Sequence, residues 1–217
     1  ADKKARRGKK KNYGVKLFDE HREENLNLLR SILLNNAYHT SEYHTFTIYE
    51  PKERLIYRLP YFPDRIVHHA IMNVMESIWV KTMTDDTYSC IKKRGIHKCM
   101  YKIKRDLYHN RGKRLYCLKL DVRKFYPSID HDELKKVIRR KIKDYRLLKL
   151  LDEIIDSTDG VPIGNYLSQF FANIFLSELD HSIKENFHMK YYYRYADDIV
   201  IISENKNMLF LLLDYIK

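Results

Sequence analysis

The amino-acid sequence predicts an α+β fold. The first half carries segments with the apolar period of helices and one alternating, β-branched stretch that is typical of a hairpin. The second half runs strand, helix, helix, hairpin, with a boundary near residue 113. The 217 residues are enough to bury a real core, in one large domain or in two small lobes.

Four elements are expected before residue 113, on apolar periodicity in three helices and on alternation around a polar turn in one hairpin. They are a helix within 18–34, a hairpin within 43–60, a helix over 64–83, and a basic loop that runs into a helix within 93–110. His68 and His69 are expected to be core or interface residues, because no third metal ligand appears at suitable spacing. In the last helix we expect Met100, Ile103 and Leu107 to face inward.

The second half is expected to begin with a strand within 114–129 that ends in a turn. Asp130 and Glu133 then give a capping-box-like start to a helix over 131–142. The Gly/Pro turn at 160–165 opens another helix. Its apolar face carries Leu167, Phe170, Phe171, Ile174 and Phe175. The segment 190–203 is expected to form strand, two-aspartate tip and strand.

Charge points to a polyanionic partner. Lys and Arg number 41 against 29 Asp and Glu, a net charge of +12, which favours nucleic acid or an anionic membrane face. Residues 1–12 carry seven basic residues, and we expect a disordered, solvated arm there, with a defined nucleic-acid contact as the alternative.

Cysteine usage and hydropathy favour a reducing setting. Cys90, Cys99 and Cys117 form no metal-ligand spacing, and an odd number argues against a disulfide framework. No apolar run approaches the ~18 to 20 residues of a membrane span, and the N-terminus lacks a signal-peptide pattern. We therefore expect a cytoplasmic protein that does not contact membranes.

Two adjacent aspartates interrupt a sequence that otherwise favours a buried sheet. Asp197 and Asp198 repel each other unless a metal or a cationic partner compensates their charge. One interpretation is that both are simply turn residues without a chemical role, whose side chains lie in water. Asp121 favours the other interpretation, because it ends a strand that could lie beside the hairpin. Three carboxylates from two strands can hold two Mg²⁺ ions about 3.5 to 4 Å apart, the geometry of in-line phosphoryl transfer.

Three stretches resemble motifs A, B and C of the reverse transcriptases, in that order: LDVRKFYPSI, GVPIGN with SQFFANIFLSELDH, and YYRYADDIVIIS. The upstream ARRGKK, EPKERLIY, DRIVHHAI and RGIHK resemble the fingers of bacterial retroelement enzymes, closest to diversity-generating retroelements and more distantly to group II introns. The resemblance implies a right-hand polymerase with an antiparallel palm sheet packed on helices. It divides the chain into a tail (1–12), fingers (13–113) and a truncated palm (114–217), with the thumb absent.

The resemblance also implies the site. The catalytic residues would be Asp121, Asp197 and Asp198, and Val122 would join these three in holding two Mg²⁺ ions, for which Mn²⁺ could substitute. Nucleotide contacts would come from Lys52, Arg54, Tyr126, Ile163 and Gly164. Template or primer contacts would come from Asn165, Ser168, Gln169, Tyr195 and Arg94.

Two positions depart from the family pattern. Ile163 stands where many relatives have Gln, and Ile91 where they often have Arg, which leaves the contacts near Arg94 open. The implied partners are an RNA template, a DNA or RNA primer and dNTPs, with self-association through the face left open by the missing thumb. The alternatives are a polymerase-derived, maturase-like RNA-binding protein without activity and, less favoured by the motifs, a two-metal nuclease.

Overall fold

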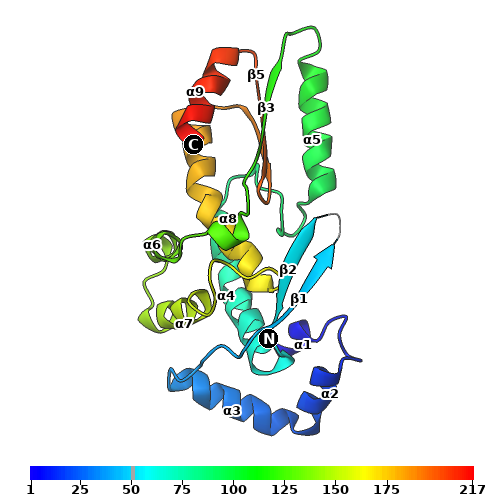
Figure 1. The fold of residues 1–217 in the computed structure, drawn as a ribbon, viewed down its shortest axis with the longest axis vertical. Helices are drawn as coiled ribbons and strands as arrows, with labels where there is room; N and C mark the ends of the chain where they lie inside the picture. Colours follow the sequence, from blue (N-terminus) through cyan, green and yellow to red (C-terminus); the bar gives the residue numbers. More distant parts are fainter. Residues whose placement is uncertain (50–51) are drawn as a thin grey trace. The chain divides into compact units, whose positions relative to one another are not determined.

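The computed structural model describes residues 1–49 and 52–217, and it confirms the α+β fold (Figure 1). The chain forms two compact units. The first unit consists of Ala1–Ile78 and Tyr126–Phe171, and the second of Trp79–Phe125 and Ala172–Lys217. Each unit is therefore built from two separate stretches of sequence. The division into fingers and palm at residue 113 is a different partition and stays a prediction.

The first unit combines helices with a two-stranded sheet. Strands β1 (His44–Tyr49) and β2 (Glu53–Arg58) pair antiparallel, which confirms the hairpin, although Glu50 and Pro51 of its turn lie outside the described residues. The helices are α1 (Asp2–Ala5), α2 (Tyr13–Glu20), α3 (Arg22–Leu34), α6 (His131–Lys141) and α7 (Tyr145–Ile155), with a π-helical turn (Tyr61–Arg65) and the 3₁₀ turn η2 (Tyr126–Ser128). Two long helices, α4 (Ile66–Thr82) and α8 (Tyr166–His181), contribute residues to both units.

The N-terminal segment is ordered, so the expectation of a disordered arm over 1–12 was wrong. Asp2 is buried and accepts hydrogen bonds from the guanidinium groups of Arg6 and Arg22, each at 2.9 Å. The Tyr61 hydroxyl donates to the same carboxylate. The expectation rested on the seven basic residues and the single acidic residue of this segment. That acidic residue, Asp2, binds two arginines and so attaches the segment to α3 and the π-helical turn.

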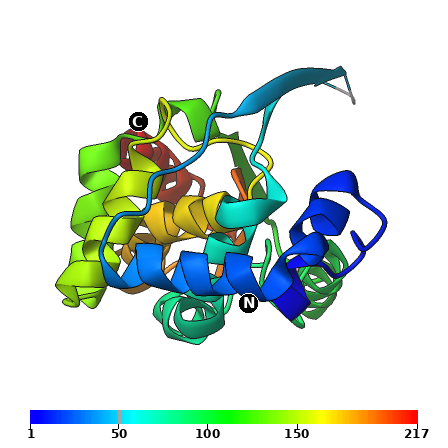
Figure 2. The same cartoon turned by 90° about the horizontal axis from the view of Figure 1, so that it is seen from below.

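Local capping explains where α6 and α7 begin. The Asp130 side chain accepts from the Glu133 backbone N–H at 2.9 Å, which confirms the cap expected at the start of α6. Asp144 accepts from the Leu147 N–H at 2.8 Å and starts α7, a helix that was not among the expected elements. The end of α3 lies near α7 (Figure 2). Leu33 of α3 and residues along α7 line a cavity of about 550 Å³.

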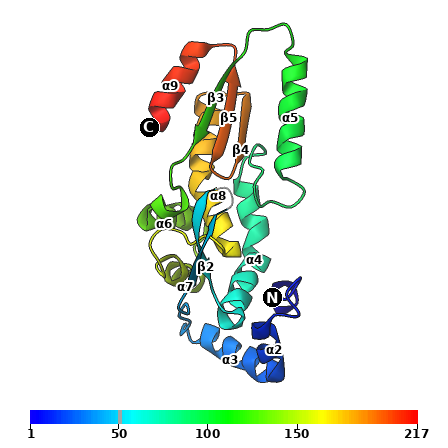
Figure 3. The same ribbon diagram turned by 45° about the vertical axis from the view of Figure 1, so that its right-hand side comes forward.

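The second unit is built on a three-stranded antiparallel sheet in the order β3–β5–β4, made of β3 (Tyr116–Asp121), β4 (Tyr191–Tyr195) and β5 (Asp198–Ser203). These bounds confirm the expected strand and hairpin. Helix α9 (Lys206–Ile216) contacts β3 and β5, and α5 (Ile96–His109) contacts β4 (Figure 3). A π-helical turn, Ser182–Asn186, follows α8.

The two faces of this sheet differ in chemistry. Leu118 and Leu120 of β3 join Tyr192, Ile199 and Ile201 in the apolar cluster to which α9 also contributes. On the opposite face, alternate residues of β3 are exposed. They are Cys117, Lys119 and Asp121. The apolar cluster therefore fixes the face on which the exposed residues of β3 lie, because strand side chains alternate.

Helix α5 packs differently from the expectation. Cys99 is buried and Ile103 is half-buried, but Met100 and Leu107 are exposed, so their inward placement was wrong. The inward face packs Cys99 and Ile103 against Tyr193 and Ile202, and polar contacts add to this packing. The Tyr193 hydroxyl donates to Asp106 at 2.8 Å, and the Asn110 amide donates to the Tyr191 hydroxyl at 2.7 Å. Apolar periodicity could not reveal a face held by hydrogen bonds to strand tyrosines.

The structure also bears on the state of the cysteines and on membrane-spanning helices. The three cysteines are free thiols. Within the part of the chain that the structure describes, no helix combines the length and the apolar character that crossing a bilayer requires.

We expect Asp2→Ala to lower the free energy of unfolding by about 3 kcal/mol, because it leaves two arginines and a buried hydroxyl without their common acceptor. Urea unfolding followed by circular dichroism measures the change. The control Lys3→Ala, at an exposed position next to it, should stay within about 0.5 kcal/mol of the parent. Equal losses in the two variants would contradict the ordered segment.

Candidate active site

The strand register brings two of the three predicted carboxylates together. Asp121, the last residue of β3, is the direct cross-strand partner of Asp198, the first residue of β5. Direct partners in an antiparallel pair lie on one face with Cβ atoms about 4.5 to 5.5 Å apart. Asp197 is the second residue of the two-residue turn between β4 and β5, and Asp198 follows it as the first residue of β5. The structure therefore gathers the backbone positions of all three at one end of the sheet.

A lysine that sequence analysis missed lies beside these carboxylates. Lys119 is two residues before Asp121 on the same exposed face, and its Nζ is 3.9 Å from Oδ1 of Asp198. The two side chains are 70% and 55% exposed, so the ion pair adds little stability. Alternation along β3 is the signal that could have found it, because residues 119 and 121 share a face. Lys119 therefore places an exposed positive charge near Asp198.

The donor set suits magnesium in its chemistry. Carboxylate oxygens are the ligands that Mg²⁺ prefers, and Asp121 and Asp198 stand opposite each other at an exposed sheet end. Val122 follows directly after β3. Over residues 1–49 and 52–217, no three or more His, Cys, Asp or Glu side chains are gathered closely enough to hold a metal ion. The fit thus rests on residue type and register, and metal binding by these four residues stays a prediction.

The nucleotide set lies on the first unit, where two turns are held together. The Val161 N–H donates to the carbonyl of Tyr126 at 2.9 Å, which ties the turn after β3 to the Gly/Pro turn before α8. Gly160 permits this approach: it has φ +59°, and a Cβ there would lie 2.6 Å from the Pro127 carbonyl oxygen. Tyr126 is half-buried at the start of η2.

Gly164 serves a similar close approach to the hairpin. Its φ is +120°, and a Cβ would lie 2.7 Å from the Tyr57 carbonyl oxygen of β2. The Tyr57 N–H donates to the carbonyl of Ile163 at 2.7 Å. The structure therefore explains Gly164 by backbone contact with β2, and its contact with a nucleotide stays a prediction. Lys52 and Arg54 are exposed on the same hairpin.

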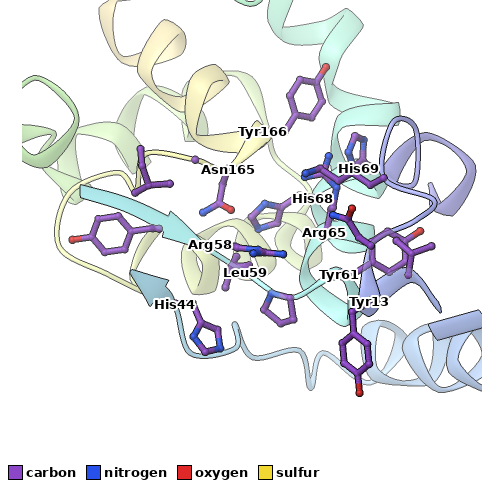
Figure 4. Close-up of a pocket in the computed structure, with 18 of the residues that line it drawn as sticks. Tyr13, His44, Arg58, Leu59, Tyr61, Arg65, His68, His69, Asn165 and Tyr166 are labelled. Atoms are coloured by element: carbon purple, nitrogen blue, oxygen red, sulfur yellow. The ribbon is translucent and has the colours of Figure 1, made fainter. Parts of the chain in front are cut away.

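A cavity of about 920 Å³ opens in the first unit beside this turn (Figure 4). Asn165 and His68 are buried in its wall, and neither the Asn165 Nδ2 nor the His68 Nε2 has a hydrogen-bond partner within the described part of the chain. The Nε2 of His69 is also unpartnered there, and its ring stacks on Tyr166 at 5.2 Å between centroids. Buried polar atoms without partners are costly, so they mark a place where a polar ligand would be stabilised.

Cations surround the same cavity. Lys9, Arg58 and Arg65 line it, and the nearby charge of Arg65 lowers the pKa of Lys9, followed by burial and the charge of Arg58. Burial lowers the pKa of His68 and of His69 to about 4, so both rings are neutral at pH 7. The cavity thus combines a positive rim with neutral polar groups inside. Of this set, only Gly164 and Asn165 were predicted to belong to the site. His68 and His69 were expected in the core or an interface, because their place in a helix also suits a plain core face.

The remaining predicted contacts divide between the units. Ser168 is buried and Gln169 exposed in the first turn of α8. Tyr195 is the cross-strand partner of Asp198 in the second unit. Arg94 is mostly buried, and its guanidinium donates to the carbonyls of Thr84 at 2.7 Å and Thr87 at 3.0 Å. Arg94 therefore has a structural task, and a template contact by any of these four residues stays a prediction.

Comparison with known proteins gives a consistent result. The family described as "Reverse transcriptase (RNA-dependent DNA polymerase)" matches residues 50–217. Protein YkfC of Escherichia coli K12 is 28% identical over 179 residues, covering 75% of this chain and 46% of that protein. The retron Ec73 reverse transcriptase of E. coli is 27% identical and covers 79% and 53%. The group II intron-encoded protein LtrA of Lactococcus lactis is 28% identical and covers 56% and 22%.

Solved structures agree on the fold. Apo telomerase from Candida tropicalis superposes with a TM-score of 0.60 at 14% identity, covering 82% of this chain and 46% of that one. At this identity the likeness concerns the fold alone. The chain spans about half the length of YkfC and the retron enzyme and about a fifth of LtrA.

We expect stability to fall as pH drops from about 6.5 to about 4. In this window the unfolded chain protonates His68 but the folded chain does not, so protons favour unfolding by up to about 1.4 kcal/mol per pH unit. Urea unfolding of the parent and of His68→Gln at several pH values measures the slope. The variant should show a shallower slope below pH 6.5 and the same slope above pH 7.5. Parallel curves throughout would contradict the neutral, buried ring.

Proposed function

The chain belongs to the reverse transcriptase family, and on that premise we propose that the protein is an RNA-directed DNA polymerase that extends a primer 3′-hydroxyl with dNTPs on an RNA template. The observation that carries the proposal is the register that sets Asp121 against Asp198, with Asp197 in the adjoining turn. A protein that only binds RNA gains nothing from exposed carboxylates at this position, because they repel phosphates.

In this proposal Asp121, Val122, Asp197 and Asp198 hold two Mg²⁺ ions, with Mn²⁺ as a substitute. Bound there, the ions would supply charge stabilisation for the attacking and leaving oxygens of phosphoryl transfer. Lys119 would keep the carboxylates partly neutralised beforehand, as its 3.9 Å separation from Asp198 supports. The membership of the family, whose enzymes use divalent ions in general, supports the same assignment.

The chain's own residues would select and orient the nucleotide. Tyr126 is proposed to lie under the sugar and to exclude a 2′-hydroxyl, which favours dNTPs over NTPs. Its hydrogen-bonded link to the turn at residue 161 supports this role, because it fixes the backbone that carries the ring. Ile163 and Gly164 would form the floor for the nascent pair. Lys52 and Arg54, exposed on the hairpin, would contact the triphosphate as cations.

The cavity beside Asn165 is proposed to receive the template strand. Its positive rim suits phosphates, and its unpartnered amide and imidazole nitrogens suit the edge of a base. Ser168 and Gln169, in the helix that follows, would extend the same contact. Tyr195 and Arg94, which belong to the second unit, are proposed as separate template or primer contacts. The side chains named here are sufficient for these proposed template and primer contacts.

The biological setting is also a proposal. Relatives named for a retron and for a group II intron support a bacterial retroelement, and the affinity to diversity-generating elements stays a prediction. We infer a cytoplasmic location and self-association as part of this proposal. The exposed Phe210, Leu211 and Tyr215 of α9 support self-association, which analytical ultracentrifugation would detect.

We expect Asp197→Asn to abolish primer extension on poly(rA)/oligo(dT) with Mg²⁺, lowering the rate at least ~100-fold, or about 2.7 kcal/mol of transition-state stabilisation. Incorporation of labelled dTTP measures it. The matched control Asp214→Asn, an exposed carboxylate of α9, should stay within twofold. Extension by Asp197→Asn at the parent rate would contradict the proposal. RNA binding without any product from the parent would indicate the maturase-like alternative, and RNA cleavage a nuclease.

We expect Arg58→Ala to weaken binding of single-stranded RNA and to reduce the slope of log affinity against log salt by about 1, because one phosphate contact is lost. Fluorescence anisotropy at several salt concentrations measures both. Arg30→Ala removes an exposed arginine of α3 that does not line the cavity and serves as the control. Identical salt slopes for Arg58→Ala and Arg30→Ala would contradict a template path through the cavity.

A further inference from the structure

A buried ion pair lies directly beneath the turn that carries Asp197. Arg194, in β4, and Asp180, near the end of α8, are both 0% exposed. Arg194 Nε donates to Asp180 Oδ1 at 2.7 Å, and Arg194 Nη2 donates to Oδ2 at 2.6 Å. This two-bond geometry fixes the plane of the guanidinium as well as its position.

The rest of the guanidinium is fully used. Arg194 Nη1 donates to Oδ1 of Asn173 at 2.9 Å and to the carbonyl oxygen of Ala196 at 3.0 Å, and Nη2 donates to the carbonyl of Asn173 at 3.3 Å. An arginine has five N–H donors, and all five are accounted for. One of them reaches the backbone of the turn itself.

The acceptor in the turn is a strained residue. Ala196 has φ +55°, in the left-handed region that is unfavourable for an alanine and that glycine adopts freely. Its carbonyl belongs to the peptide that continues into Asp197. The hydrogen bond from Arg194 therefore holds the peptide that sets the position of the Asp197 backbone. Strain of this kind persists only where neighbouring contacts over-determine the backbone.

Further bonds hold the ion pair in place. The Thr87 hydroxyl donates to Asp180 at 3.0 Å, and the Tyr192 hydroxyl donates to the same carboxylate. The Arg194 N–H donates to the Asp86 carbonyl, and the Arg194 carbonyl accepts from the Tyr88 N–H, each at 2.9 Å. The segment from Asp86 to Tyr88 thus pairs with the outer edge of β4 at Arg194.

The acceptor amide is fixed from the same segment. The Asn173 amide donates to the carbonyl of Ser89 at 2.9 Å, which orients its oxygen toward Arg194. All members of this network belong to the second unit. Replacing a buried ion pair with apolar residues often costs no stability, so stability alone gives no reason for a guanidinium here. The contact with Ala196 gives one, because an apolar side chain could not make it.

We propose that Arg194 is a positioning residue, aligned by Asp180 and Asn173, that holds the left-handed turn at Ala196 and so sets Asp197 for its part in nucleotide transfer. The inference rests on the proposed polymerase function for its catalytic consequence. The restraint that Arg194 places on the turn does not depend on that function. The two parts call for separate measurements.

Arg194→Lys keeps the charge and loses the planar fork. We expect kcat for primer extension to fall tenfold or more while KM for dNTP changes less than threefold, because substrate binding groups are untouched. Hydrogen–deuterium exchange at residues 196–198 should rise at least tenfold, whereas exchange in β3 should not change. Adding Ala196→Gly should restore part of kcat, because glycine adopts the left-handed conformation without the restraint.

Tyr192→Phe is the matched control. It removes a hydroxyl donor to Asp180 but leaves the Arg194 contact with Ala196. We expect a loss of thermal stability with kcat within twofold of the parent. Equal losses of kcat in Tyr192→Phe and Arg194→Lys at equal stability would overturn the proposal, as would a kcat loss that merely follows the folded fraction.

If Arg194→Lys does not fold by circular dichroism, Asn173→Ala provides the test, because it removes an acceptor that orients the guanidinium and keeps the ion pair. It should raise exchange at 196–198 and lower kcat, and unchanged exchange there would overturn the proposal. If the parent protein extends no primer, the polymerase function fails by itself. The exchange measurement still decides whether Arg194 restrains the turn.

Discussion

The pairing of β3 with β5 is the constraint on which the carboxylate site depends. A shift of one residue would turn Asp121 and Asp198 to opposite faces, because side chains alternate along a strand. The register is specified by the apolar side of the same strands, where Leu118, Leu120 and Ile199 pack in the cluster joined by α9. Burial on one face therefore determines chemistry on the other.

Acidic groups of the second unit differ in how they are paired. Asp180 and Asp86 are buried and fully paired with cations, Asp180 with Arg194 and Asp86 with Lys102 and Lys184. Asp198, in contrast, keeps a weak and exposed partner in Lys119. Strong pairing inside makes a rigid frame, and weak pairing outside leaves an anionic group accessible to an incoming cation.

Much of the fold could be predicted from the sequence, because period and capping are local signals. The hairpin, the strand ending at Asp121 and the cap at Asp130 all follow from neighbouring residues. The ordered N-terminus and the polar inner face of α5 could not be predicted, since they depend on partners far along the chain, such as Tyr61 for Asp2. The site divides in the same way. Motif spacing identified the aspartates, whereas the unpartnered nitrogens of the cavity and the buried guanidinium of Arg194 are visible only in three dimensions.

The β1–β2 hairpin is attached to the turn before α8 by the hydrogen bond from the Tyr57 N–H to the Ile163 carbonyl. The absence of a side chain at Gly164 lets the two backbones come close enough for this bond. Movement of a hairpin attached in this way would disturb the turn that carries Ile163. A tilt of β2 would displace the backbone at residue 163, to which it is hydrogen-bonded. A displacement of β2 would therefore be passed on to the segment that precedes α8.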